Sequence, residues 1–444
     1  MESGDTKEIV IEPCRSNGSP DEGVLEEKGV FRHSPNGPDF RAVSWQRATI
    51  IFLKIQFAMS ILSVPESLAT LGAVGGALSI VGWEVLNTYT AVILGEFRNR
   101  HPECHTLSDM CGVVLPRVGR ELVGIQILVA QVIITAAGIV SISTAFNALS
   151  HHSTCTVAFN AIAAILITRF SSIRTLAHLG WITWVGFATF FIAIFIFVMS
   201  VTQLDRPVGA PATGEFDLGW IAIASPTFTA GMLTTANIFI SSSRSSMYLP
   251  VISEMRRPSK YQKAALLAGA IIRIATPAFG SGGPLFKKLC YGLALPGLVI
   301  GVGIYQHVAA KLIFVRLLRD SHHLQENTAV HWITWLGANL LLGVLGFVIA
   351  EAVPILNYLL GLAGSLCFAP FSLMYPAMLW MYDFRAWRHG TKSKQAIYWL
   401  HAFIILLGGF MVIGGTYSVA VTLREAYADG SIGKPFSCAD NSGS

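Results

Sequence analysis

The sequence predicts an all-α polytopic membrane protein, and three observations support this. Hydrophobic residues make up 53% of the 444 residues and charged residues only 13%, against about 25% charged residues in a soluble domain. The mean hydropathy is +0.56. Apolar segments that could cross a bilayer, which takes roughly 20 residues, recur along the chain. They lie at 48–71, 73–97, 121–149, 155–170, 178–202, 218–241, 285–315, 330–350, 353–382 and 396–423.

One further apolar segment, 264–275, is unusually short. As a helix it would span roughly 18 Å, against a hydrocarbon core of about 30 Å. The positive-inside rule still favours counting it as a crossing. With the N-terminus in the cytosol and this segment included, the basic residues of 98–120, 244–263 and 385–394 all fall on the cytosolic side. We therefore expect about eleven crossings, the seventh of them truncated.

The two ends of the chain are expected to lie outside the membrane. Residues 1–44 are rich in Glu, Ser, Gly and Pro, and such a composition cannot bury a core. They are predicted to form a disordered cytosolic tail, and no cleavable signal peptide is expected. Residues 45–423 form the predicted transmembrane domain, and 424–444 a short C-terminal tail.

Other classes of function find little support in the sequence. The seven cysteines are scattered without a C-x-x-C pair, so neither a disulfide framework nor a zinc site is expected. No basic run is interleaved with aromatic residues, so nucleic acid is not an expected partner. H-E-x-x-H, G-x-S-x-G and P-loop patterns do not occur. We expect no enzyme activity, no cofactor and no metal site.

The first apolar segment carries the strongest functional signal. Ser60, Ser63 and Pro65 lie near its middle, and Glu66 follows. Pro65 has no N–H to donate and its ring clashes with the preceding turn, so we predict an interruption between Ala58 and Pro65. Irregular backbone at membrane depth is tolerated where it is buried in protein or lines a watery cavity. Such a break is a common solute site in transporters, although a proline kink that serves packing alone is the alternative.

A second interruption is predicted in the sixth segment, between Pro226 and Ser241. This segment contains Gly231 and the polar stretch 234–243. Breaks in corresponding helices of two five-helix halves indicate an inverted-repeat transporter, and the two breaks should face each other across one cavity. The alternative is a helix interface rich in small residues.

Several motifs then occur in a specific order along the chain. They are Leu53-Lys54, Phe57-Ala58, Leu62–Pro65, Leu71–Trp83, Ile252–Pro258, Gly280–Lys288, His307–Lys311 and Ile349–Pro354. Over Val43–Trp380 the chain resembles the amino acid/auxin permease family and, within it, the fungal neutral amino acid permeases. The resemblance implies a leucine-transporter-like inverted repeat of eleven helices. It also implies uptake of neutral amino acids driven by a proton gradient or, less often, a sodium gradient.

Three departures from the family pattern matter. Ser60 stands where the family usually has Gly, and Ser241–Ser246 replaces a stretch that tends to contain Tyr and Gly. The seventh helix is about 20 residues shorter than in the family, which continues past the equivalent of Ile274 before reaching Pro277. The alternative function is therefore a non-transporting remnant or a receptor-like membrane protein.

The predicted substrate site lies between the two interruptions. Backbone N–H groups of the first would bind an amino acid carboxylate, helped by the positive end of the following half-helix. Carbonyls and hydroxyls of the sixth helix would bind the amino group. The candidate substrate-binding residues are Ala58, Met59, Ser60, Ile61, Ser63, Thr229, Thr234 and Asn237.

Two acidic residues are candidates for ion coupling. Glu66 and Glu84 are ionisable within predicted membrane segments, where such residues are usually functional; pairing with Lys54 or exposure to water is the alternative for Glu66. Gln126, Gln131 and Thr135 could line the pathway or bond between helices. His307 is expected to be a buried, satisfied histidine. The plasma membrane is the expected location, and the sequence leaves the oligomeric state open.

Overall fold

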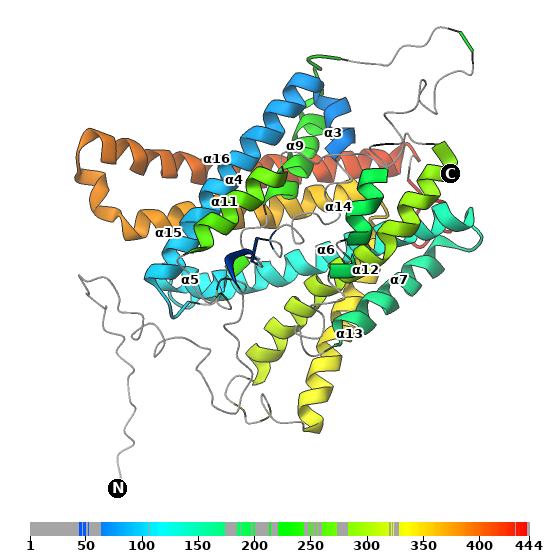
Figure 1. Cartoon of the computed structure of the whole chain (residues 1–444), viewed down its shortest axis with the longest axis horizontal. Helices are drawn as coiled ribbons and strands as arrows, with labels where there is room; N and C mark the ends of the chain where they lie inside the picture. The colour runs from blue at the N-terminus through cyan, green and yellow to red at the C-terminus, as the bar shows by residue number, and fades with distance from the viewer. Residues whose placement is uncertain are drawn as a thin grey trace.

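The computed structural model describes most of the chain, and its regular elements there are helices (Figure 1). The described residues are 44–46, 48–49, 52, 64–104, 106–173, 184–186, 188–196, 199, 213–214, 221–243, 248–249, 252, 255, 260–272, 283–318, 321, 323, 328–430 and 432–441. Residues 58–63 of the predicted first interruption and the tail 1–43 lie outside these residues.

Six of the described helical runs are long and apolar enough to cross a membrane. They are α4 (Ala73–Arg100), α6 (Val118–Ser150), α12 (Gly283–Leu318), α13 (Ala329–Ala352), the continuous run Leu356–Asp383, and α16 (Lys392–Ala428). The run Leu356–Asp383 consists of α14 (Leu356–Leu362), the π-helical turns η5 (Ala363–Phe368) and η6 (Pro370–Met374), and α15 (Tyr375–Asp383). The chain is therefore an all-helical, multi-span membrane protein, as predicted.

Shorter helices complete the described part of the bundle. They are α3 (Val64–Leu71), α5 (Leu107–Val114), α7 (Thr156–Ser171), α9 (Phe228–Ser242), α11 (Tyr261–Ile272) and the 3-10 helix η7 (Arg385–His389). The expected total of eleven crossings stays a prediction, because several of these helices border residues outside the described part.

Helix α6 is the centre of the bundle. Helices α5, α7, α12, α13 and α14 pack against it, and residues 130–143 are buried all the way round. Such a helix belongs in the interior of a large protein. Small residues bring its neighbours close: a Cβ added at Gly138 would lie 2.3 Å from Val302 of α12, and one at Gly346 of α13 would lie 2.8 Å from Thr135. Close backbone approach of this kind is typical of membrane helix packing.

The turn between α3 and α4 is fastened to the segment that leads into α9. The N–H groups of Ala73 and Val74 donate to the carbonyls of Ile221 and Ala222, each at 2.9 Å. Gly72 has φ +79°, and an added Cβ would lie 2.7 Å from the Ala224 nitrogen. A side chain is excluded there both by the left-handed backbone and by this contact. Since α3 also packs against α9, the first and sixth segments lie side by side.

The predicted interruption of the sixth segment is wrong over residues 228–241, which form a continuous helix. Pro226 precedes α9, and Thr227 caps it by accepting from the N–H of Ala230. The hydroxyls of Thr235 and Ser241 donate to carbonyls four and three residues earlier. Serine and threonine satisfied in this way remain inside a helix. The polar stretch therefore does not break the helix.

The described part of α11 begins at Tyr261, which holds this end of the helix in place; the short length of the seventh crossing stays a prediction. Its first residue, Tyr261, is fully buried and donates through its hydroxyl to the carbonyl of Ala91 at 2.9 Å. A Cβ added at Gly95 would lie 2.1 Å from the Tyr261 ring, so glycine leaves room for the ring on α4. The helix comprises 12 residues, and 273–282 lie outside the described part.

The expectation of no disulfide is wrong. Cys155 and Cys438 are bonded, with their Cα atoms 4.6 Å apart across a sequence separation of 283 residues. Such a separation leaves no spacing pattern to recognise. The bond fastens the last described residues to α6 and α7. There Thr156 donates to the Ala439 carbonyl at 2.7 Å, and Asn441 bonds both Ser143 and Asn147.

Candidate functional site

The sequence-predicted residues of the first segment are not part of the described structure. Ala58, Met59, Ser60, Ile61 and Ser63 lie outside it, and Glu66 is described only by its backbone in α3. Pro65 is the second residue of α3. In the first turn of a helix a missing N–H removes no intrahelical bond, so Pro65 is compatible with the start of a half-helix.

Helix α9 places two predicted residues in the protein interior. Thr234 and Asn237 are 7% and 5% exposed, and residues three apart share one face of a helix. The Asn237 Oδ1 has no hydrogen-bond partner among the described residues and lies close to Gly361 of α14, 3.5 Å from where a Cβ would be. Thr229 lies nearer the start of α9, its hydroxyl 3.2 Å from that of Thr227. The face thus offers a buried oxygen that can accept from a ligand N–H.

Glu84 lies on the face of α4 that meets α9. It is 4% exposed and accepts a hydrogen bond from Thr88 at 3.4 Å. One turn further, Asn87 donates to Ser242 of α9 at 2.6 Å. The structure therefore brings a buried carboxyl group to the α4–α9 pair, and the coupling role of Glu84 stays a prediction.

A feature that sequence reasoning missed is the widened helix after α14. Pro370 has no N–H to offer the carbonyl of Leu366, and its ring crowds that carbonyl. The helix takes up π-type turns on both sides of Ala369, a distortion frequently found at functional sites. The side-chain amide of Gln126 on α6 donates to the Leu366 carbonyl at 2.9 Å, and Tyr375 donates to the Gln126 Oε1 at 2.6 Å. Gln126 therefore bonds between helices, one of its two predicted roles.

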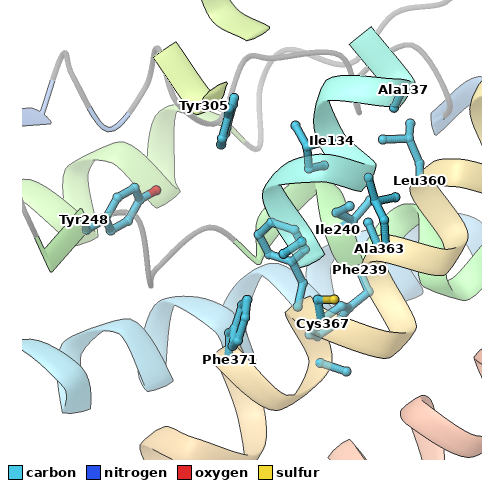
Figure 2. Close-up of a cluster of buried hydrophobic side chains, with 14 of the residues drawn as sticks. Ile134, Ala137, Phe239, Ile240, Tyr248, Tyr305, Leu360, Ala363, Cys367 and Phe371 are labelled. Carbon is cyan, nitrogen blue, oxygen red and sulfur yellow. The ribbon is translucent and has the colours of Figure 1, made fainter. Parts of the chain in front are cut away.

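Apolar side chains pack tightly around the first π-type turn, η5 (Figure 2). Ile134 and Ala137 of α6, Ile240 of α9 and Ala363 of η5 converge there. A Cβ added at Gly364 would lie only 2.6 Å from the Ala236 carbonyl, so α9 and the widened helix touch backbone to backbone. The Pro370 position in an apolar run and the glycines before it were the available signals.

Other predicted polar residues have structural roles. Thr135 donates to the carbonyl of Gln131 in its own helix at 2.9 Å. His307 is fully buried, and its Nδ1 lies 3.0 Å from the Ser171 carbonyl. Since a carbonyl only accepts, Nδ1 carries the proton in that bond. The His307 Nε2 has no partner within the described residues, so His307 is buried as predicted but only half satisfied.

Buried polar groups between packed membrane helices are typical of solute transporters, and comparison with known proteins agrees. The model of the family described as "Transmembrane amino acid transporter protein" matches residues 41–286 and 285–421. The chain belongs to this family, the amino acid/auxin permeases, as its motifs predict. It is thus a multi-pass integral membrane protein of an amino acid transporter family, and not an enzyme.

Similar proteins extend over almost the whole chain. A "Transmembrane transporter" of Gibberella moniliformis is 60% identical over 435 residues, covering 94% of this chain and 92% of the relative. The "N amino acid transport system protein" of Neurospora crassa is 25% identical over 452 residues and covers 95% of each chain. Among solved structures, MhsT in complex with L-phenylalanine has a TM-score of 0.49 at 12% identity, covering 88% of this chain and 99% of that one.

Proposed function

We propose that the protein is a secondary active transporter that imports neutral amino acids, coupled to protons, with sodium as the alternative ion. The observation that carries the proposal is the family match, which extends over 41–421. We further propose a leucine-transporter-like inverted repeat, because the first and sixth segments, which correspond in such a repeat, pack side by side through α3 and α9.

The proposed substrate site lies along α9, which packs against both α3 and α14. The amino group of the substrate would donate to Asn237 Oδ1, which is buried without a partner among the described residues. A buried acceptor without a hydrogen-bond partner costs about 1–3 kcal/mol. A ligand N–H that donates to Asn237 Oδ1 would supply the hydrogen bond that this oxygen lacks in the free protein. The carboxylate would lie before α3, where helix-terminal N–H groups favour an anion. This assigns Ala58, Ser60 and Ser63 to the carboxylate side.

Glu84 is the proposed coupling residue, with Glu66 as the second candidate. A carboxyl group that is 4% exposed is costly when ionised unless it is compensated. Taking up a proton neutralises it, so a proton gradient could drive a change of conformation at the α4–α9 interface. Sodium would instead bind to the ionised carboxylate.

The proposed orientation places the N-terminus in the cytosol and the protein in the plasma membrane. Disulfides persist in oxidising surroundings outside the cytosol. The Cys155–Cys438 bond lies at the end of the bundle opposite the turn between α15 and α16 (Figure 1), and that turn is rich in Lys and Arg. This agrees with the distribution of Lys and Arg that the positive-inside rule requires.

The experiment is uptake of a panel of labelled amino acids into cells that lack their own permeases, at two external pH values. We expect neutral amino acids to accumulate faster at the lower pH. Asn237→Leu should abolish uptake, and Glu84→Gln should remove its pH dependence. Asn357→Leu, on α14, is a control for the loss of an amide. Equal accumulation by the Asn237→Leu variant would contradict the site, and no accumulation of any amino acid would contradict the transport function.

One observation favours the alternative function, a non-transporting remnant or receptor-like protein. The apolar segment 264–275 holds only about a dozen residues, and the family match divides at 285–286, shortly after it. A mismatch of roughly 10 Å, at a fraction of a kcal/mol per Å, amounts to several kcal/mol. Insertion of about 20 apolar residues after Ile274 should therefore raise uptake at matched surface expression. Binding of a labelled amino acid without uptake, by the natural chain, would favour the receptor-like reading.

A further inference from the structure

The turn between α15 and α16 carries an unbalanced cluster of positive charge. Its exposed cations, which we call the basic turn, are Arg385, Arg388, Lys392 and Lys394. No Asp or Glu occurs between Asp383 and Glu425. None of the four cations has an acidic partner among the described residues. Residues three apart eclipse one another in a 3-10 helix, so Arg385 and Arg388 of η7 point the same way.

Three arginines near this end of the bundle are paired with acidic side chains. Arg100 pairs with both Glu96 and Asp383, Arg120 pairs with Asp109 at 3.5 Å, and Arg316 pairs with Glu121. The basic turn differs from these three arginines because it places four cations within ten residues and has no acidic partner among the described residues. The basic turn is left available for an external anion.

The position of the basic turn relative to the bilayer follows from α16. Trp399, Phe403, Leu406, Phe410, Ile413 and Tyr417 form one exposed apolar stripe along this helix. From Trp399 to Tyr417 the helix rises about 27 Å, close to the roughly 30 Å of a hydrocarbon core. Trp and Tyr are the residues that mark membrane interfaces. Lys394 lies five residues before Trp399, about 8 Å further out, which is the depth of the lipid headgroups.

We infer that the basic turn binds anionic phospholipid headgroups of the leaflet it faces. Four unpaired cations at headgroup depth complement a phosphate-rich, negatively charged surface. The Lys394 ammonium lies over the Trp387 ring, 5.4 Å from its centroid, so its stem is ordered beside an aromatic anchor. The bound lipid would hold the α15–α16 hairpin, which projects at the edge of the molecule (Figure 1).

Lipid retention by the purified full-length chain tests this without requiring transport. The protein in uncharged detergent is titrated with dioleoyl phosphatidylserine or dioleoyl phosphatidylcholine, and retained lipid is counted by native mass spectrometry. One cation near the surface corresponds to about a fivefold change in affinity. Arg388→Gln/Lys392→Gln should therefore raise the half-saturating phosphatidylserine concentration roughly twenty-fivefold, and 0.5 M NaCl should raise it in the natural chain.

The matched control is Arg424→Gln/Lys434→Gln, which removes two exposed cations at the opposite end of α16. It should bind phosphatidylserine as the natural chain does, and both variants should unfold at the natural temperature. Equal retention of the two lipids by the natural chain, or equal losses in the two variants, would overturn the inference. So would displacement of phosphatidylserine by 10 mM inorganic phosphate, which would indicate a site for free anions.

The other available anion is the N-terminal tail, since residues 1–27 contain eight acidic and two basic residues. The aromatic stripe and the headgroup depth favour lipid over this tail. Glu22→Gln/Glu26→Gln/Glu27→Gln separates the two. Unchanged phosphatidylserine binding in this variant supports lipid as the occupant. Markedly tighter binding would show that the tail covers the basic turn in the natural chain, which would overturn the inference.

Discussion

Replacing Cys438 by serine is the perturbation with the best-defined physical consequence. The bond to Cys155 joins the end of the chain to the start of α7 across 283 residues. Without it, residues 432–441 are held only by noncovalent contacts, among them the bonds of Asn441 to Ser143 and Asn147. We expect the end of α6 and the start of α7 to lose their covalent link to the C-terminal segment, and the protein to become less stable.

The size of the effect follows from loop closure. A loop of this length corresponds to about 5–6 kcal/mol in the chain-entropy estimate at 25 °C. Membrane helices persist in the unfolded state and restrict the chain already, so this figure is an upper bound and about 2–4 kcal/mol is expected. Against a typical total of about 5–15 kcal/mol, this is enough to lower the unfolding temperature by several degrees.

The assay is thermal unfolding of purified protein followed by tryptophan fluorescence. Cys438→Ser, Cys155→Ser and the double variant should unfold at one common lower temperature, because all three lack the same bond. Dithiothreitol should bring the natural chain to that temperature and leave the variants unchanged. Cys367→Ser, at a buried free cysteine, is the control for loss of a thiol. If reduction did not lower the unfolding temperature of the natural chain, the Cys155–Cys438 bond would contribute nothing to stability and the reasoning would be refuted.

Three further predictions test the proposed substrate site, the widened helix and the contact between His101 and Asp383. Ser60→Phe should abolish amino acid uptake at normal surface expression, because the ring would fill the proposed carboxylate site; unchanged uptake kinetics would contradict that site. Gln126→Leu should lower the free energy of unfolding by about 1–3 kcal/mol, since two partly buried groups lose their partner, and adding Tyr375→Phe should restore part of it in thermal unfolding. The hydrogen bond that His101 donates to the Asp383 carboxylate, opposed by burial, raises the pKa of His101, so the imidazolium is favoured in the folded state. That stability is present below the ordinary pKa of about 6.5 and is lost as pH rises through the folded value. The natural chain should therefore lose its advantage over His101→Gln as the pH rises above about 6.5; an advantage that does not change with pH would contradict this.

The helical class could be read from the sequence because its causes are local. Long apolar segments predict spanning helices, and the positions of α4, α6, α13 and α16 agree with the apolar runs. The disulfide could not be read in this way. Cys155 and Cys438 become neighbours only when the beginning of α7 and the end of the chain meet at one end of the bundle, which depends on packing rather than on spacing.

Proline illustrates why the interruptions were only partly predictable. Pro226 lies before α9, so it removes no helical bond, whereas Pro370 lies within the run Leu356–Asp383 and widens it into π-type turns. The run survives because a glutamine on α6 supplies the donor that Pro370 lacks: Gln126 bonds the Leu366 carbonyl from 240 residues away. The effect of a proline thus depends on a partner that local sequence does not reveal.

The polar residues of α9 lead to a sharper view of the proposed site. Because α9 is continuous, with Ser243 N–H donating to the Phe239 carbonyl at its end, the carbonyls of residues 228–239 take part in helical bonds. Thr234 and Asn237 can contribute only through side-chain atoms. A substrate amino group would therefore bind to α9 through the Asn237 amide oxygen. Backbone groups for the site must come from residues outside this helix, and Asn237→Asp, which keeps an oxygen at this position, should retain more uptake than Asn237→Leu.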